Sequence, residues 1–527
     1  MTSTMHQRAG TASGAPVTTF DIRTPETNQG RAGAREWIAL AVLMLPVLLV
    51  AVDATVLSFA LPSISQSLAP TGTQLLWMVD IYPLVLAGLL VSMGSLADRT
   101  GRRRLLLIGA VGFAAVSALA AYAPSAEWLI AARAALGFFG AMLMPATLSL
   151  LRNLFVDRQQ RRLAIAIWAA GFSGGAALGP IVGGFLLEHY WWGSAFLMAV
   201  PVLVLLLILA PVFVPESKDP NPGAIDVVSI ALSLLTMVPL VYAIKSIAHD
   251  GLSAAALGLV VLGLLAGSTF VRRQLTRANP MLDVRLFRRS AFTGAVLANL
   301  LAVFALVGFL FFVAQHLQLV LGYSPMESGL ILLPGLLVTI IAGLAVVPLV
   351  RVLSPRIVVA GGLLISAAGY VAILFTADDP SAWGLGLAFM LLSLGIGAAE
   401  TISNDVIVSS VPADKAGAAS AISETAYELG AVLGTAVLGG ILSAVYAAQV
   451  VVPAGLDAAA ATSAGETLGG ATAVAATLPE PAAAQLLESA RHAFDSGVVF
   501  TAAIAVVLVL SAAALAWMTL RGKGAES

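Results

Sequence analysis

The lysines and arginines of this chain lie in every second gap between long apolar stretches. Fourteen such stretches run along the 527 residues, and all but three of the 27 basic residues fall in alternate gaps or at the two ends. Cytoplasmic loops of membrane proteins carry this excess of basic residues, and the loops on the other side do not. The pattern therefore predicts an all-α integral membrane protein with fourteen transmembrane helices and both termini in the cytoplasm.

The composition agrees with this prediction. Hydrophobic residues make up 59% and charged residues 10% of the chain, whereas a soluble domain carries about 25% charged residues. The net charge of -1 gives no reason to expect a nucleic-acid partner, and the lack of cysteine excludes disulfides and thiolate metal sites. The first 35 residues are polar and have no apolar core with a cleavage site, so we expect a disordered cytoplasmic tail rather than a signal peptide.

Each apolar stretch is long enough to cross a bilayer, which takes about 20 residues of helix. The expected spans are 36–60, 74–97, 104–122, 127–151, 162–187, 194–214, 225–246, 252–271, 291–316, 326–350, 356–376, 383–408, 416–446 and 496–520. Helix-breaking residues at 215–224 close a first block of six helices. The long Ala-rich gap 447–495 shows helical patterning near 481–495, and it is either a packed hairpin or a loose loop.

A faint internal repeat suggests how these spans are grouped. The basic gap after the second span, Gly94–Arg104, corresponds to the short basic gap Val350–Arg356 after the tenth. Two six-helix bundles with a substrate site between them are common in secondary transporters. The expected parts are therefore a tail (1–35), a first bundle (36–214), a linker with two inserted helices (215–271), a basic cytoplasmic loop (272–290), a second bundle (291–520) and a tail (521–527).

Three motifs carry a resemblance to a known family. The segment GSLADRTGRRR (Gly94–Arg104) matches a loop signature of the major facilitator superfamily, and GFSGGAALGPIVGG (Gly171–Gly184) matches the signature of its antiporters. The segment VDATVLSFALP (Val52–Pro62) matches the first-helix motif of its fourteen-helix drug:proton antiporters. From about residue 36 to 520 the chain resembles this QacA-type family.

The resemblance implies a major facilitator fold and a multidrug efflux antiporter that is not an enzyme. It implies export of ethidium, acriflavine, quaternary ammonium compounds and, as a wider range, fluoroquinolones. The driving force would be the proton-motive force, with no cofactor and no metal. The partners would be cationic drugs, protons and membrane lipid, and the protein would be a monomer in the bacterial inner (cell) membrane.

The Gly94–Arg104 segment is the candidate gating loop. Glycines permit a tight turn between antiparallel helices, and Asp98 is suited to pair with an arginine or cap a helix. Such a charge cluster would latch one conformation, although arginines that only fix the topology are the alternative. The candidate residues are Gly94, Asp98, Arg99, Gly101, Arg102 and Arg103.

The fifth span carries glycines at four-residue spacing. Gly171, Gly175 and Gly179 share one smooth helix face that allows another helix to approach closely, and Pro180 is expected to bend the path. We expect close packing at the interface between the bundles, which limits leakage. Gly183 and Gly184 complete the motif.

Ionisable residues inside the membrane are expensive and usually functional. The direction of each span places Asp53, Asp80 and Arg133 in the outer half of the bilayer, so we expect Arg133 to be countered by Asp53, Asp80 or both. Proton coupling would then use these carboxylates, and a static structural ion pair is the alternative. Lys245 and Asp226 lie near the ends of the seventh span and are expected to reach the surface.

A second polar face lies on the thirteenth span. Ser420, Glu424, Tyr427, Glu428 and Thr435 fall on one helical stripe, with Glu428 roughly 18 Å from the cytoplasmic end. Paired carboxylates suit the exchange of a proton for an organic cation, and Tyr427 would add cation–π contact. Interhelical hydrogen bonding is the alternative. Glu400 on the twelfth span is deep enough to take part, while Asp405 is expected to be solvated.

These features favour proton-driven export of lipophilic cations by alternating access. A major facilitator exporter of a lipid, siderophore or other metabolite remains the alternative, because an acidic pocket also accepts zwitterions. An uptake symporter fits the glycine motif less well, and a channel would show uncoupled flux. The sequence has no GxxxxGK[ST] loop and no soluble domain for a nucleotide, which argues against an ATP-driven pump.

Overall fold

The computed structural model describes residues 32–219, 226–277, 280–375, 381–411 and 416–520. Every regular element in these ranges is a helix, and fourteen candidate spans are long and apolar enough to cross a membrane. The predicted all-α membrane fold is therefore confirmed. The tails 1–31 and 521–527 lie outside the described residues.

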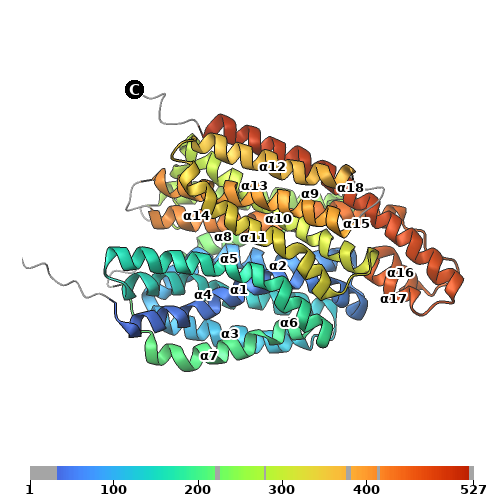
Figure 1. Ribbon diagram of the computed structural model, residues 1–527, viewed down its shortest axis with the longest axis horizontal. Helices are drawn as coiled ribbons and strands as arrows, with labels where there is room; N and C mark the ends of the chain where they lie inside the picture. Colours follow the sequence, from blue (N-terminus) through green and yellow to red (C-terminus); the bar gives the residue numbers. More distant parts are fainter. Residues whose placement is uncertain (1–31, 220–225, 278–279, 376–380, 412–415, 521–527) are drawn as a thin grey trace, which may run out of the picture.

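The chain forms a first half, an inserted helix pair and a second half (Figure 1). The first half consists of α1 (Ala34–Leu68), α2 (Gly72–Thr100), α3 (Arg102–Ala121), α4 (Ala126–Leu154), α5 (Arg158–His189), α6 (Ser194–Leu197) and α7 (Ala199–Phe213). The inserted pair is α8 (Val227–Asp250) and α9 (Ala254–Thr276). The second half consists of η1 (Val284–Arg288), α10 (Ser290–Gln315), η2 (His316–Val320), α11 (Pro325–Leu349), α12 (Pro355–Phe375), α13 (Ala382–Ser409), α14 (Ala416–Gly434), η4 (Thr435–Gly439), α15 (Gly440–Gln449), α16 (Ala458–Glu466), α17 (Leu468–Ala475) and α18 (Glu480–Thr519).

Short polar motifs set where the helices begin. Thr71 and Gln74 cap the start of α2 reciprocally, each side chain bonding the other residue's backbone N–H. Ser324 and Glu327 do the same for α11, and Asp157 accepts two backbone N–H groups at the start of α5. These caps satisfy amide groups that have no partner within the helix, so each span starts at a defined residue.

The two halves lie as layers side by side, with α1–α7 below and α10–α15 and α18 above in Figure 1, while α16 and α17 lie at the right-hand end. Across the boundary, α2 packs on α14 and α5 packs on α11. Each half therefore contributes its second and fifth spans to the interface. We call the side that carries Arg104, Arg152 and Arg351 the basic side, and the other end of the spans the opposite side.

The inserted pair does not stand apart from the two halves. α8 packs against α2 of the first half and against η4 and α15 of the second. α9 packs mainly against α8. The first inserted helix thus lies where the two halves meet.

The gap 447–495 is a packed helical hairpin, which settles the alternative that the sequence left open. α16 and α17 fold onto the opposite side, and α18 begins at Glu480, earlier than the expected 496. The Tyr446 hydroxyl donates to the Ala464 carbonyl at 2.9 Å, and Glu466 accepts the Gly72 N–H at 3.0 Å. The hairpin therefore ties the end of the second half to the start of α2 in the first.

Candidate functional site

A cavity of about 840 Å³ lies between the halves toward the basic side. Its walls come from α2, α4 and α5 on one half and α13 and α14 on the other, with Met281 and Leu282 beside them. Its polar and charged lining residues are Ser95, Asp98, Ser149, Arg152, Asn404, Asp405, Ser420 and Glu424. The volume lies in the range of pockets that bury a drug-sized molecule.

At the opposite side the halves are in contact. The Gln318 side-chain amide donates to the Phe59 carbonyl at 3.1 Å, joining η2 to α1. Gly184 of α5 approaches Met326 of α11 so closely that an added Cβ would lie 2.7 Å from the Met326 Cα. The cavity is therefore closed on this side and lies toward the basic side.

Three glutamates of the second half gather beside the cavity. Glu424 lines it, Glu428 lies one turn further along α14, and Glu400 comes from α13. Glu424 is within electrostatic range of both others. Among the described residues, no lysine, arginine or histidine forms an ion pair with any of the three. The structure thus brings together the glutamates that the sequence singled out, and their roles stay predictions.

Tyr427 joins this cluster to the first half. Its side chain lies within electrostatic range of Glu400, Glu424 and Glu428, and its ring meets the Phe172 ring of α5 edge-on at 6.2 Å. The polar stripe does not continue as one regular α-helix, because η4 is a π-helical segment that begins at Thr435. Thr435 is fully buried.

Arg133 is the central cation of the first half. Its Nη1 lies 3.0 Å from Asp53 Oδ2, and the two side chains are 2% and 7% exposed. Its Nε donates to the Met78 carbonyl, and its guanidinium lies 4.6 Å from the centroid of the Tyr82 ring. The predicted pairing of Arg133 with Asp53 is confirmed, and Tyr82 in turn lies within electrostatic range of Glu428.

Asp80 has a different partner from the one expected. Its Oδ2 lies 2.8 Å from Lys245 Nζ, so of the alternatives that the sequence left open, Asp53 and not Asp80 pairs with Arg133. The expectation that Lys245 reaches the surface was wrong, because α8 continues to Asp250 and buries this lysine inside the protein. The position of Lys245 within an apolar span was the sequence signal that it needs a buried acidic partner.

The gating segment is mostly helical rather than a loop. Gly94 lies within α2 against Pro145 of α4, so it does not form the turn, whereas Gly101 separates α2 from α3 with a φ of 115°. Asp98 pairs with Arg102, four residues later, at 2.7 Å. Arg99 is exposed at the end of α2.

Glu216 is the residue of this region that sequence reasoning missed. Its carboxylate accepts the backbone N–H groups of Arg103 and Arg104 at 3.0 and 3.1 Å, which caps the start of α3. Arg103 also donates to the Val214 carbonyl. The segment after α7 therefore holds the gating segment within the first half.

The glycine face of α5 lies against α1. An added Cβ at Gly175 would lie 2.8 Å from Ala51 Cβ, and one at Gly179 would meet the Thr55 side chain. Gly171 faces Met44 and Gly183 faces Val56. The expected packing at the interface between the bundles is therefore wrong for most of this face, which packs within the first half, and only Gly184 and Pro180 meet α11 of the second half. α5 continues through Pro180 without a break.

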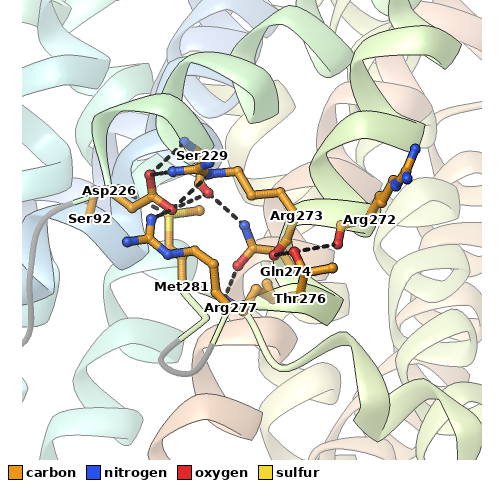
Figure 2. A network of polar contacts seen from close by, with 10 residues as sticks. Ser92, Asp226, Ser229, Arg272, Arg273, Gln274, Thr276, Arg277 and Met281 are labelled. Carbon is orange, nitrogen blue, oxygen red and sulfur yellow. Dashed lines mark hydrogen bonds and ion pairs between the residues drawn. The ribbon is translucent and has the colours of Figure 1, made fainter.

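Asp226 anchors the inserted pair at the basic side (Figure 2). Its carboxylate pairs with Arg273 at 3.0 Å and with Arg277, and it caps α8 through the Ser229 N–H, so it does not reach the surface freely. Burial raises the pKa of Asp226, but hydrogen bonds from Arg273, Ser229 and Arg277 outweigh this effect and hold that pKa well below its usual range.

The same network reaches the cavity wall. Gln274 donates to the Ser229 hydroxyl at 2.7 Å and accepts the Leu282 N–H at 3.2 Å. The Ser92 hydroxyl of α2 donates to the Met281 sulfur at 3.5 Å (Figure 2). Met281 and Leu282, which line the cavity, are thus positioned by the inserted pair.

Several other polar and aromatic residues of the spans lie at the cavity or at the opposite side. Asp405 is exposed, as expected, and lines the cavity, as does Trp168. Arg491 and His492, in the segment with helical patterning, lie on α18. His316, which sequence reasoning did not single out, places its Nε2 2.9 Å from Asp495 Oδ1 at the opposite side.

Comparisons with known proteins agree with this architecture. Residues 43–435 match the Major Facilitator Superfamily. The multidrug efflux pump LfrA of Mycolicibacterium smegmatis is 58% identical over 94% of this chain and 98% of its own length. The methyl viologen resistance protein SmvA of Salmonella typhimurium is 38% identical over 90% of this chain and 97% of its own. The tetracenomycin C resistance and export protein of Streptomyces glaucescens is 34% identical over 91% of each chain.

Solved structures share the fold at low sequence identity. A bacterial homologue of the human lysosomal transporter Spinster, in an inward-facing and unoccupied conformation, aligns with a TM-score of 0.65, 19% identity and coverage of 93% of this chain and 99% of that one. A POT family transporter aligns with a TM-score of 0.61 and 13% identity, covering 90% and 94%. The resemblance drawn from the sequence motifs is confirmed: the chain belongs to the Major Facilitator Superfamily and is a multi-pass membrane transporter, not an enzyme.

Proposed function

We propose that this protein is a proton-coupled antiporter that exports lipophilic organic cations. One observation carries the proposal: three carboxylates, Glu400, Glu424 and Glu428, gather beside a drug-sized cavity and have no cationic ion-pair partner among the described residues. All three side chains are half-buried within the spans, where negative charge without a partner is expensive. A cationic ligand or protons would compensate the charge of the carboxylates. A protonated carboxyl group no longer attracts the cation, so proton and cation compete.

The competition between proton and cation supplies the coupling. A lipophilic cation that enters the cavity gains attraction to the carboxylates, which is strong where water is largely excluded. The rings of Tyr427 and Trp168 add apolar contact and cation–π attraction. When protons from the other side neutralise a carboxylate, this attraction is lost and the cation is released.

Alternating access would open the contact between the halves at the opposite side and close the cavity at the basic side. In the present conformation the cavity lies toward the basic side and the halves touch at the opposite side. We place the basic side in the cytoplasm, so that this conformation is the one that loads substrate. Both termini then lie in the cytoplasm, and the bilayer is the bacterial inner membrane.

The relatives support drugs as the substrate class. Their names describe a multidrug efflux pump, a methyl viologen resistance protein and a tetracenomycin C resistance and export protein. We propose ethidium, acriflavine and quaternary ammonium compounds as substrates, with fluoroquinolones as a further class. A monomer powered by the proton-motive force is sufficient for this cycle.

Ethidium transport in proteoliposomes tests the proposal. An imposed pH gradient should drive ethidium movement by the wild type, and Glu428→Gln and Asp53→Asn should reduce it. Glu488→Gln, which alters an exposed carboxylate on α18, is the matched control and should transport normally. Gradient-driven movement that survives both test variants would move the coupling site to Asp80, Glu400 or Glu424. No ethidium movement under any gradient would refute the drug-pump proposal.

A lipid or metabolite exporter is the second candidate, and one feature favours it. An apolar cavity of about 310 Å³, lined from α2, α8, α9, α10 and α14, shares Val91, Met281 and Leu282 with the main cavity. Such a side chamber suits an acyl chain. Competition of ethidium transport by a long-chain zwitterionic lipid would support this candidate, and competition by tetraalkylammonium ions alone would support the drug pump.

A further inference from the structure

The first inserted helix places a buried cation against the first half. Lys245 of α8 lies with its Nζ 2.8 Å from Asp80 Oδ2 of α2, and the two side chains are 1% and 0% exposed. The same ammonium lies 4.0 Å from the centroid of the Trp77 ring. An inserted helix that served only as an attachment would have no need of a charge at this depth.

The two charged groups depend on each other. Within the described part of the chain, neither makes a hydrogen bond of good geometry besides the ion pair. The Thr435 hydroxyl is a near neighbour of Asp80 and lies 3.4 Å from the Ala431 carbonyl oxygen. Loss of either partner would therefore leave the other charge buried and uncompensated, which is strongly unfavourable.

The pair lies where the halves touch. Asp80 is roughly 12 Å along α2 from its opposite-side end, at 1.5 Å per residue. On the same side, an added Cβ at Gly439 of η4 would lie 2.6 Å from the Leu76 side chain of α2. Leu84 of α2, Val241 of α8 and Val432 of α14 form one buried cluster beside the pair. α2, α8 and the α14–η4 segment thus meet at one contact.

We propose that Lys245 is a positioning residue for transport: its ion pair with Asp80 holds α2, α8 and η4 together and stabilises the closed opposite side. This inference rests on the alternating access of the proposed function. The inserted pair is then part of the gate. When the opposite side opens, α2 separates from η4, and the surroundings of the Asp80–Lys245 pair change with it.

Distance measurements between two labels test the inference. The chain contains no cysteine, so Ser149→Cys on α4 and Val408→Cys on α13 introduce a single pair of labels across the cavity. Electron-electron resonance distances are recorded in lipid nanodiscs without any substrate. The variants are Lys245→Met, Lys245→Arg, Asp80→Asn and the double variant Asp80→Asn/Lys245→Met. Leu235→Met, on the exposed face of α8, is the matched control.

The ion pair predicts a specific pattern of populations. The labels come closer together when the cavity closes at the basic side and the opposite side opens. Lys245→Met should therefore raise the ratio of short to long label distances by roughly tenfold or more, because the closed opposite side then holds Asp80 without its counter-ion. Asp80→Asn, which leaves Lys245 unpaired, should act in the same direction. The double variant should return toward the background, Lys245→Arg should stay close to it, and Leu235→Met should match it.

Two outcomes would overturn the inference. Identical distance distributions in all variants would make the pair a passive structural contact. A double variant shifted as far as Lys245→Met would mean that the lysine acts through packing rather than through charge. Because no substrate is used, a failed ethidium assay alongside shifted distances would refute the drug-pump proposal and leave the role of Lys245 intact.

Discussion

In the first half of the molecule, Asp53 and Asp80 each lie against a basic side chain, at 3.0 Å from Arg133 and 2.8 Å from Lys245. In the second half, Glu400, Glu424 and Glu428 gather beside the cavity with no such partner among the described residues. The two halves share a helical architecture and differ in how they compensate the negative charge inside their spans.

This difference suggests a division of labour. A carboxylate that is paired with a basic side chain of the protein needs no ligand to compensate its charge. The pair stabilises the arrangement of helices in which it forms. A carboxylate without such a pair takes its compensation from whatever enters the site, a proton or a cationic ligand. We therefore expect changes in the first half to act mainly on stability and conformation, and changes in the second half to act mainly on coupling.

The largest expected effect is that of Arg133→Leu. It leaves Asp53 buried without its cation, and the free energy of unfolding should fall by about 3–5 kcal/mol. Unfolding in detergent, followed by circular dichroism, measures the loss. The double variant Asp53→Asn/Arg133→Leu should recover much of it. If Arg133→Leu is as stable as the wild type, the ion pair does not stabilise the first half.

Glu428→Gln should separate coupling from stability. We expect unchanged unfolding, because the residue has no ion pair to lose among the described residues, and a fall in gradient-driven ethidium transport on the order of tenfold, equivalent to about 1.4 kcal/mol. Parallel transport and unfolding assays on the same preparation measure both. A variant that unfolds more easily yet transports normally would contradict the division of labour.

Asp226→Asn extends the comparison to a paired carboxylate at the edge of the membrane. The variant should lose about 1–3 kcal/mol of stability through its weakened contacts to Arg273 and Arg277. Because the folded pKa of Asp226 is lowered, its contribution is fully present above its unfolded pKa of about 3.9 and is lost only as the pH falls through the folded pKa.

The pH dependence supplies the check on this prediction. The difference in melting temperature between wild type and Asp226→Asn should be the same at pH 8 and pH 5. A difference that disappears at pH 5 would show that Asp226 is not held by its arginines as described. Ethidium transport by the folded variant should stay close to that of the wild type.

Glu216→Ala has the smallest expected effect. The carboxylate caps α3 through two backbone N–H groups, and loss of a helix cap costs about 0.5–2 kcal/mol. Thermal unfolding measures this loss, and Glu488→Gln on α18 serves as the comparison. Unchanged stability would indicate that water replaces the carboxylate at the two N–H groups.

Much of the architecture followed from local patterns. Mean hydropathy over about 20 residues located the spans, and the alternation of basic residues predicted their direction. The direction of each span was enough to place Asp53 and Arg133 at the same depth, where they pair. The helical spacing of Glu424, Tyr427 and Glu428 placed them together on one face of α14.

Other features depend on contacts between distant parts of the chain. Lys245 was expected near a helix end, because the sequence does not show that α8 packs between α2 and η4. The Ala-rich segment 447–495 has no long apolar run, and its hairpin is defined by contacts with α1 and α2. Gly94 was assigned to a turn by its motif, although it lies within α2, and its contact with Pro145 depends on how α2 meets α4.

Local sequence patterns were sufficient for the membrane-spanning character, the number of spans and the shared helical face of Glu424 and Glu428, because hydropathy, charge placement and helical periodicity are properties of neighbouring residues. The family resemblance came instead from three short motifs. The tertiary structure alone decided which cation compensates each buried carboxylate. Ion pairs such as Lys245–Asp80 join residues far apart in the chain, and only the packing of α8 against α2 brings their charges within 2.8 Å.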